Sequence, residues 1–331
     1  MPGSEEYRQL GKRIFLQGAY MATVTRQKPP APKRGAVPPP RKPAGPVSAK
    51  GKVVAKSKPK ASFVPAKGYD FEQLYPDGLN ARGSTTVVCY GPSGVGKTSI
   101  WSFLPDVGIL YDPKDEGIAD LVRFGQCPTP KWMHEAKDFE NTLELLANVA
   151  NQEYDIKHLV LDSLTGFELF CFQYHCAENF ENDWSKNGFY AFMSGPKNAA
   201  KTDWPRLLDA LDDVRRAGIS VVAIAHSQIK PVNNPDGENY DQHMPYLDKE
   251  TWQQTHRWAK AVLFYNVEVG LEKKGNKAKA KAGSEERAIY TDLAATFIAK
   301  NRWGIEPRID AGGSAEDAYN AFMKAYMEAG Q

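Results

Sequence analysis

GPSGVGKTS, the run from Gly91 to Ser99, is the stretch of sequence that decides the fold of this chain. It fits the pattern G-x-x-x-x-G-K-[ST], in which a glycine-rich loop holds a phosphate group. The preceding residues, 85–90, are β-branched and apolar, as in a buried strand, and residues 99–104 can continue as a helix. A strand, a glycine-rich loop and a helix in this order predict a site for nucleotide phosphates.

The chemistry of this loop assigns a role to each part of it. Its glycines let the backbone curl so that N–H groups point inward at a phosphate, and the helix N-terminus adds partial positive charge. The ammonium of Lys97 can reach the β- and γ-phosphates, and the hydroxyl of Thr98 can ligate Mg²⁺. We therefore expect ATP and Mg²⁺ as cofactors. The expected nucleotide-binding residues are Gly91, Pro92, Ser93, Gly94, Val95, Gly96, Lys97, Thr98 and Ser99.

Charge is distributed unevenly along the chain. The net charge of +2 over 331 residues combines a basic segment, residues 1–67, with an acidic remainder. The segment holds 15 Lys and Arg, two Glu and 11 of the 23 prolines, a net charge of +13, whereas the remainder carries −11. Because such a composition buries too little apolar surface to offset chain entropy, we expect a disordered tail. The tail either binds nucleic-acid phosphates or only keeps the protein soluble.

Cysteine content and hydropathy indicate the compartment. The four cysteines, Cys89, Cys127, Cys171 and Cys176, are too few and too scattered for a disulfide framework. This favours the reducing cytoplasm, that of the host if the protein is viral. Cys171, His175 and Cys176 are metal-ligand types without a second pair at zinc spacing, so core or helix-surface positions are the preferred interpretation. No segment has the length and apolarity of a signal peptide or a membrane span, so we expect no membrane partner.

Strand-like and helix-like runs alternate from about Gly68 onward, which predicts an α/β fold with a parallel sheet covered by helices. A capping box from Ser314 to Asp317 predicts the start of a final helix. Three parts are expected: a basic tail over 1–67, an α/β core over 68–312 and a C-terminal helix over 313–331. The other expected strands lie at 107–112, 158–163, 219–225, 262–269 and 288–300, the last two partly antiparallel and joined by a Lys-rich tip. Helices are expected over 138–152 and 205–217.

Acidic side chains at strand ends supply groups that phosphate chemistry needs. Asp162 follows an apolar strand that we expect beside the loop, where its carboxylate would hold the metal. Capping of the following turn is the alternative role for this residue. Hydrolysis also needs a base that positions water. Among the acids that end a neighbouring strand, Asp112, Asp115 and Glu116, we choose Glu116, although a solvated turn also explains three acids.

Three further residues are candidates for catalysis. His226 ends the fourth expected strand, where it can sense the γ-phosphate or simply make a local hydrogen bond. Lys300 and Arg302 are separated by one residue, so both can project from the same face of a late strand. They either stabilise phosphate charge in the site of a neighbouring subunit or are surface cations.

This ordered set of segments resembles the RecA-like ATPases, over about residues 80–305. The matching residues are GPSGVGKT, Asp112 to Glu116, LVLDS with Asp162, Ala225-His226, and KNR at 300–302. In that superfamily a late Lys-x-Lys or Lys-x-Arg completes the ATP site of a neighbour, so the resemblance implies a homo-oligomer. It also implies a RecA-like P-loop NTPase core, a mostly parallel twisted sheet flanked by helices. The segments 112–117, DSLTG and AHSQ are most similar to small bacteriophage ATP-binding proteins linked to single-strand annealing and recombination.

DNA binding carries over from that resemblance only in part. RecA-type recombinases bind DNA with the loops that follow the strands of Asp162 and His226. Here the second loop, 229–247, is acidic, whereas the first interleaves aromatic residues with lysines, as a stacking surface does. Packing beneath a long loop explains these aromatics too. The residues concerned are Trp184, Lys186, Phe189, Tyr190, Phe192, Lys197, Lys201 and Trp204. Residues 63–66 and 322–325 both match the F-x-x-A peptide that some recombinases insert into the next subunit, a motif short enough to recur by chance.

The leading functional hypothesis is an ATPase that acts with single-stranded DNA in phage-type recombination, annealing or replication. A single-strand DNA-binding or annealing protein is a further expected partner. The alternative is a nucleotide-dependent regulator or assembly factor that binds a protein partner without DNA. A small-molecule or nucleotide kinase fits less well, because the Lys-rich tip 273–281 lacks the arginines of a kinase lid.

Overall fold

The computed structural model describes residues 83–115, 117–235, 237–274 and 277–329. The chain divides into two units, Met1–Lys67 and Gly68–Gln331, and every described residue belongs to the second. The predicted tail over 1–67, and with it the F-x-x-A copy at 63–66, therefore lie outside the described residues. In the part of the chain that is described, no helix is long and apolar enough to cross a membrane.

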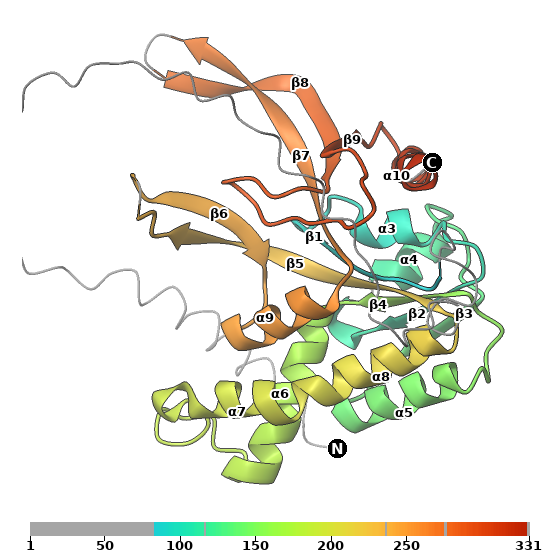
Figure 1. The fold of residues 1–331 in the computed structure, drawn as a ribbon, viewed down its shortest axis with the longest axis vertical. Coiled ribbons are helices and arrows are strands. Elements are labelled where there is room, and N and C mark those ends of the chain that lie inside the picture. The colour runs from blue at the N-terminus through green and yellow to red at the C-terminus, as the bar shows by residue number, and fades with distance from the viewer. Residues whose placement is uncertain (1–82, 116, 236, 275–276, 330–331) are drawn as a thin grey trace, which may run out of the picture. The chain divides into compact units, whose positions relative to one another are not determined.

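Nine strands of the described residues form one sheet, in the order β3-β2-β4-β5-β1-β7-β8-β9, with β6 paired to β5 (Figure 1). The strands from β3 to β7 in this order are parallel, whereas β8 and β9 are antiparallel additions at the edge. The expected α/β fold with a mostly parallel sheet is thus confirmed. The bounds are β1 (Thr86–Gly91), β2 (Val107–Tyr111), β3 (Trp132–Glu135), β4 (His158–Asp162), β5 (Ser220–Val232), β6 (Tyr240–Pro245), β7 (Ala261–Lys274), β8 (Lys277–Tyr290) and β9 (Arg308–Asp310).

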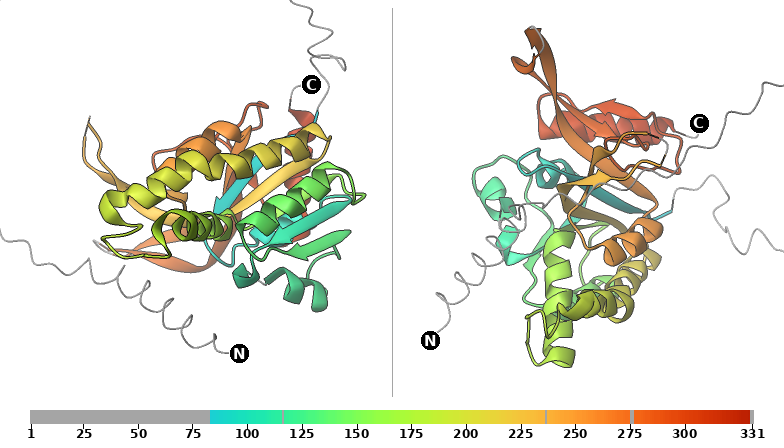
Figure 2. Two further views of the ribbon diagram at one scale, coloured as in Figure 1. Left: turned by 90° about the horizontal axis from the view of Figure 1, so that it is seen from below. Right: turned by 90° about the vertical axis from the view of Figure 1, so that its left-hand side faces the viewer.

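Helices cover both faces of the sheet, because its central strands are apolar on both sides. One face packs against α5 (Phe139–Ala150), α6 (Leu164–Phe180), α8 (Trp204–Arg216) and α9 (Lys249–Trp258), with α7 (Ser194–Thr202) beside α6 (Figures 1 and 2). The other face packs against α3 (Lys97–Trp101), α4 (Gly117–Arg123) and α10 (Ala315–Glu328). The predicted capping box of α10 is present, since Ser314 and Asp317 bond each other reciprocally.

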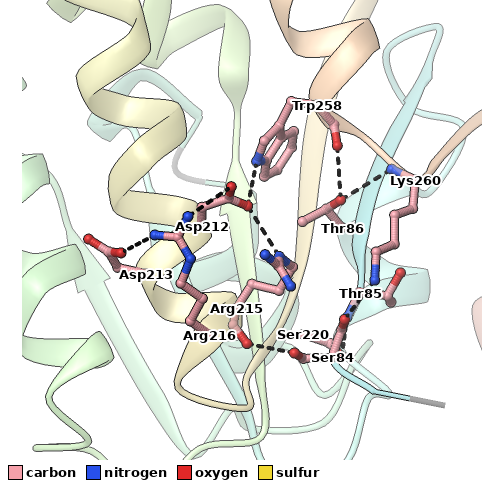
Figure 3. A network of polar contacts seen from close by, with 10 residues as sticks. All are labelled: Ser84, Thr85, Thr86, Asp212, Asp213, Arg215, Arg216, Ser220, Trp258 and Lys260. Carbon is pink, nitrogen blue, oxygen red and sulfur yellow. Dashed lines mark hydrogen bonds and ion pairs between the residues drawn. The ribbon is translucent and has the colours of Figure 1, made fainter. Parts of the chain in front are cut away.

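Polar contacts fix the amino end of β1 to its neighbours (Figure 3). The Ser84 hydroxyl donates to the carbonyl of Arg215 at the end of α8, and the Thr85 N–H donates to the Ser220 hydroxyl at the start of β5. The Thr86 hydroxyl donates to the Trp258 carbonyl and accepts from the Lys260 N–H, which joins β1 to the start of β7. These contacts set the register of the strand that carries the phosphate loop at its other end.

Two expected strand boundaries are wrong. The fourth strand does not end at His226, because β5 runs on to Val232 and pairs antiparallel with β6 over its last six residues. The late strand expected over 288–300 is also wrong, since β8 ends at Tyr290 and Lys300 forms only an isolated bridge with Val262. The first strand was predicted to be too short because the sequence beyond 226 is polar, and hairpin strands need no buried face. The second was predicted to be too long because residues 291–300 are mostly apolar yet form only isolated bridges. The β5–β6 and β7–β8 hairpins extend beyond the carboxyl ends of the parallel strands (Figure 1).

Candidate functional site

The glycine-rich loop joins β1 to α3 in a conformation that requires glycine at two of its positions. Gly94 and Gly96 have φ angles of 78° and 103°, in the left-handed region that side chains disfavour. Gly91 meets a different constraint, because a Cβ at this position would lie 1.9 Å from the carbonyl oxygen of Tyr265 on β7. The loop therefore keeps its backbone curled and packed close to the neighbouring strand.

Lys97, the first residue of α3, is buried at the centre of the loop. Its ammonium donates hydrogen bonds to the carbonyl oxygens of Gly91 and Pro92, at 3.0 and 2.8 Å. The positive charge is thus held inside the curl of the loop. Because the ammonium already lies inside the loop, it can bind an anion that enters the loop without first moving in from the surface.

Two oxygen groups meet beside the loop. The Thr98 hydroxyl donates to Asp162 Oδ2 at 2.5 Å, and both residues come from positions where the sequence predicted metal binding. A hydroxyl and a carboxylate are hard oxygen donors that suit Mg²⁺. Asp162 lies beside the loop, but its strand, β4, is not adjacent to β1, because β5 lies between the two strands. Thr98 therefore reaches across β5 near Ile224 to His226, where that strand pairs with β4 and β1.

A second acid, Asp112, contacts the backbone of Asp162. Asp112 follows β2, is buried, and donates its backbone N–H to the carbonyl oxygen of Asp162. Gly166 in the first turn of α6 makes room for it, since a Cβ there would lie 2.0 Å from Asp112 Oδ2. The side chain of Asp112 caps the following turn by accepting from the Lys114 N–H. Asp112 thus positions the end of β4 and the start of α6.

A cavity of about 690 Å³ opens over the loop. Its volume is within the range of small-molecule sites. His226 lies at its wall, with Nδ1 3.5 Å from the Ser93 hydroxyl, and its backbone N–H donates to Thr165 Oγ1. The structure thus brings His226 to the same site as the loop and Asp162. Residues from the loop, the turn after β2, α4 and the segment after it, β4, β5, β7, β8 and α10 line the cavity: Ser93 to Ser99, Lys114, Gly117, Asp120, Leu121, Phe124, Gln126, Asp162, His226, Tyr265, Arg287 and Ala315.

Lys300 and Arg302, two of the predicted catalytic residues, do not line this cavity, and the structure does not describe a third. Glu116 lies outside the described residues, so its role as a base stays a prediction. Lys300 forms a bridge with Val262 near the start of β7, toward the amino ends of the parallel strands, whereas the loop follows the carboxyl end of β1. The Lys300 ammonium donates to the His256 carbonyl. Arg302, two residues further on, is exposed. Both cations are thus distant from the loop of their own chain, and the role toward a neighbour stays a prediction.

The residues around 171–204 form a hydrophobic core rather than a metal site. Phe189 is fully buried and its ring contacts those of Phe172, Phe180 and Trp184, while Trp204 is buried beneath α9. Packing therefore explains Phe189 and Trp204, whereas Tyr190 and Phe192 are exposed together with the lysines at 186, 197 and 201. Cys171 and Cys176 are both buried, which confirms core positions for them. Among the described residues no three His, Cys, Asp or Glu side chains are grouped to hold a metal.

Sequence reasoning missed several residues of the cavity wall. Tyr265 is buried beside Gly96, and burial raises the pKa of its phenol to about 12. Arg287 is on β8, and Phe124, with 71% of its surface exposed, follows α4. The alternation of Tyr265 and Val267 on one strand with Arg287 and Ile289 on the other would have placed Arg287 on this face, had the register been known.

Comparisons with known proteins identify the core. Residues 84–303 match a family model described as an AAA domain. Among solved structures, a KaiC-like protein from the hyperthermophilic archaeon Pyrococcus horikoshii OT3 aligns with 63% of this chain and 79% of its own. That alignment has 12% sequence identity and a TM-score of 0.32. A search of the curated proteins found no match to the chain.

Proposed function

Because the chain belongs to the AAA-domain family of P-loop nucleotide-binding proteins, we propose that it is a Mg²⁺-dependent ATPase of RecA type acting with single-stranded DNA. The reaction class follows from the family, whereas ATP, the site residues and DNA are the finer parts of the proposal. The observation that carries it is the cavity in which the loop, the Thr98–Asp162 pair and His226 meet.

The phosphate chain of ATP fits the loop by charge and geometry. Backbone N–H groups of the curled loop and the Lys97 ammonium bind the phosphate oxygens. Thr98 and Asp162, which a hydrogen bond already joins, would hold the metal. The chemistry that a bound Mg²⁺ supplies is neutralisation of charge on the phosphates.

Hydrolysis requires groups that orient water and respond to the γ-phosphate. Glu116 follows the short turn Pro113–Asp115 after β2, and it is the proposed base. His226 is the proposed sensor, because its ring lies beside Ser93 and its backbone is bonded to Thr165 on α6. A shift of the ring toward a phosphate would be transmitted both to α6 and to the β5–β6 hairpin, since β5 continues directly from His226.

Two observations support DNA as the partner. Phe192 is 99% exposed, and its backbone has a φ of 51°, a conformation that costs energy for a residue other than glycine. Tyr190, two residues earlier, is also exposed, and the lysines at 186, 197 and 201 in the same segment are exposed as well. Exposed aromatics among cations are what single-stranded nucleic acid requires for stacking and phosphate contact. The basic segment 1–67 would add attraction for phosphates.

ATP turnover measured with and without single-stranded DNA tests the proposal and its alternative. We expect DNA to stimulate the wild-type protein, and Phe192→Ala to reduce that stimulation while leaving basal turnover intact. Leu293→Ala is the matched control, because Leu293 is also exposed, at 71%, but lies outside the aromatic segment. Turnover that DNA leaves unchanged would favour the regulator that binds a protein partner instead.

A further inference from the structure

Arg287 is a cation of the cavity wall to which the sequence assigned no role. It lies on β8 opposite Val267 of β7, and its side chain shares a face with Tyr265 and Ile289 in the antiparallel register. This face carries α3 and α10, and the phosphate loop opens toward it. Arg287 thus reaches the nucleotide cavity from within the same chain.

The position of Arg287 complements that of the residues already placed. In the sheet order, β4 and β5 lie on one side of β1, and β7 and β8 lie on the other. Asp162 and His226 therefore flank the loop from one side and Arg287 from the opposite side. Tyr265 lies between Arg287 and the loop, since its hydroxyl would be 3.8 Å from a Cβ on Gly96. Burial raises the pKa of Tyr265, and the nearby charge of Arg287 opposes that effect.

The guanidinium is oriented but keeps the capacity to bind an anion. One Nη1–H donates to the Gly313 carbonyl at 2.8 Å, in the segment that leads into α10. The backbone carbonyl of Arg287 accepts from the Ala311 N–H, which fixes the strand at the same point. A guanidinium has five N–H donors. Between described residues, no ion pair involves Arg287, so its charge is not neutralised by a carboxylate there.

We propose that Arg287 is a phosphate-binding residue for the nucleotide held by its own chain, on the side of the loop opposite Asp162. Its planar donors match the oxygens of a phosphate better than an ammonium does. The role differs from the one expected for Lys300 and Arg302, because Arg287 acts without a neighbouring subunit. The inference rests on the proposed nucleotide site, and it adds a cation that the loop motif does not contain.

Calorimetric binding of ADP and of pyrophosphate, to the full chain, tests the assignment. Charge-assisted hydrogen bonds contribute enough that Arg287→Gln should weaken both ligands by about tenfold to a hundredfold. Arg287→Lys, which keeps the charge but not the fork, should lie between wild type and Arg287→Gln. Pyrophosphate separates phosphate contact from contact with base or ribose, because it has neither. Arg257→Gln, an exposed arginine on α9, is the charge-matched control and should bind like wild type.

Ser314→Ala separates phosphate binding from support of α10. It removes the capping box of that helix and leaves Arg287 in place, so it should lower thermal stability without weakening either ligand. The assignment is overturned if Arg287→Gln binds pyrophosphate like wild type, or if Ser314→Ala loses as much affinity as Arg287→Gln. A wild-type protein that binds neither ligand would instead refute the nucleotide site itself, which distinguishes the two failures.

Discussion

The Thr98 hydroxyl donates a hydrogen bond of 2.5 Å to Asp162 Oδ2 and so joins the first turn of α3 to the carboxyl end of β4. The contact crosses β5 near Ile224 to His226, and β5 separates the strand of the loop from that of the acid. A metal that binds at this point would find a hydroxyl and a carboxylate already oriented toward each other. Mg²⁺ demands near-ideal geometry, and such preorganisation lowers the cost of binding it.

Two substitutions of Thr98 should separate the contribution of its hydroxyl to metal binding from that of its side-chain shape. Thr98→Ala removes the donor to Asp162, so we expect nucleotide affinity to lose most of its dependence on Mg²⁺. Thr98→Ser retains the hydroxyl and should keep that dependence. Titration of each variant with ADP, with Mg²⁺ and with EDTA, measures the difference. Equal Mg²⁺ dependence in wild type and Thr98→Ala would remove this residue from the metal site.

Gly166 should be intolerant of a side chain because of its contact with Asp112. A Cβ at Gly166 would lie 2.0 Å from Asp112 Oδ2, and both residues are in the interior beneath the site. Gly166→Ala should lower the free energy of unfolding by about 1–3 kcal/mol, the usual cost of overpacking. Gly117→Ala is the control, since a Cβ there meets nothing within 4 Å. Urea unfolding in which both variants are equally stable would contradict the close packing.

Glu168 should make stability depend on pH. Burial raises the pKa of its carboxyl from 4.5 to about 7, against hydrogen bonds from Thr251 and from the Asp248 N–H. The charge of Asp248 raises the pKa further, and that of Lys230 lowers it. Because the folded state binds this proton more tightly, its contribution is fully present below pH 4.5 and is lost as the pH rises through about 7.

Glu168→Gln isolates this contribution. Between pH 4.5 and about 7, the free energy of unfolding of the wild type should fall by up to about 3 kcal/mol relative to the variant. Glutamine keeps an acceptor for Thr251 and the Asp248 N–H but does not titrate. Chemical unfolding at a series of pH values gives the two curves. Parallel curves over this range would show that Glu168 does not carry the raised pKa.

The phosphate site was predictable because its chemistry is local in sequence. The nine residues of the loop specify their own backbone conformation through Gly94 and Gly96, and a strand-end aspartate is marked by the apolar run before it. The parallel sheet followed from the alternation of strand and helix patterns. The position of Arg287 was not predictable, because it depends on the register of β7 and β8, which the hairpin sets far from the loop.

The edges of the fold were harder to predict for a physical reason. Beyond His226, and again in the hairpin of β7 and β8, strands continue without an apolar face, so periodicity gives no signal for them. The run after β8, residues 291–300, is mostly apolar and resembles a strand in composition, yet Lys300 makes only one bridge. Backbone hydrogen bonding between strands determines where these strands end, and it leaves little trace in the pattern of side chains.

Arg302 should act in the site of a neighbouring subunit if the expected oligomer forms. It is exposed at a distance from its own loop, whereas the Lys300 ammonium is engaged by the His256 carbonyl. Arg302→Ala should therefore keep nucleotide binding but lose ATP turnover, and mixing with Lys97→Ala chains should restore part of the activity. A mixture no more active than either variant, although mixed oligomers form, would exclude a role in trans. So would turnover independent of concentration in a proven monomer.

The most direct test of the nucleotide site is the affinity of wild type and Lys97→Ala for ATP with Mg²⁺, measured by calorimetry. The Lys97 ammonium is held at the centre of the loop by the carbonyls of Gly91 and Pro92, so its loss removes the charge that meets the phosphates. We predict measurable binding by the wild type. Lys97→Ala should show little or no binding, and Lys249→Ala, an exposed lysine on α9, should bind normally. Equal ATP affinity in wild type and Lys97→Ala, with both proteins folded, would contradict the account.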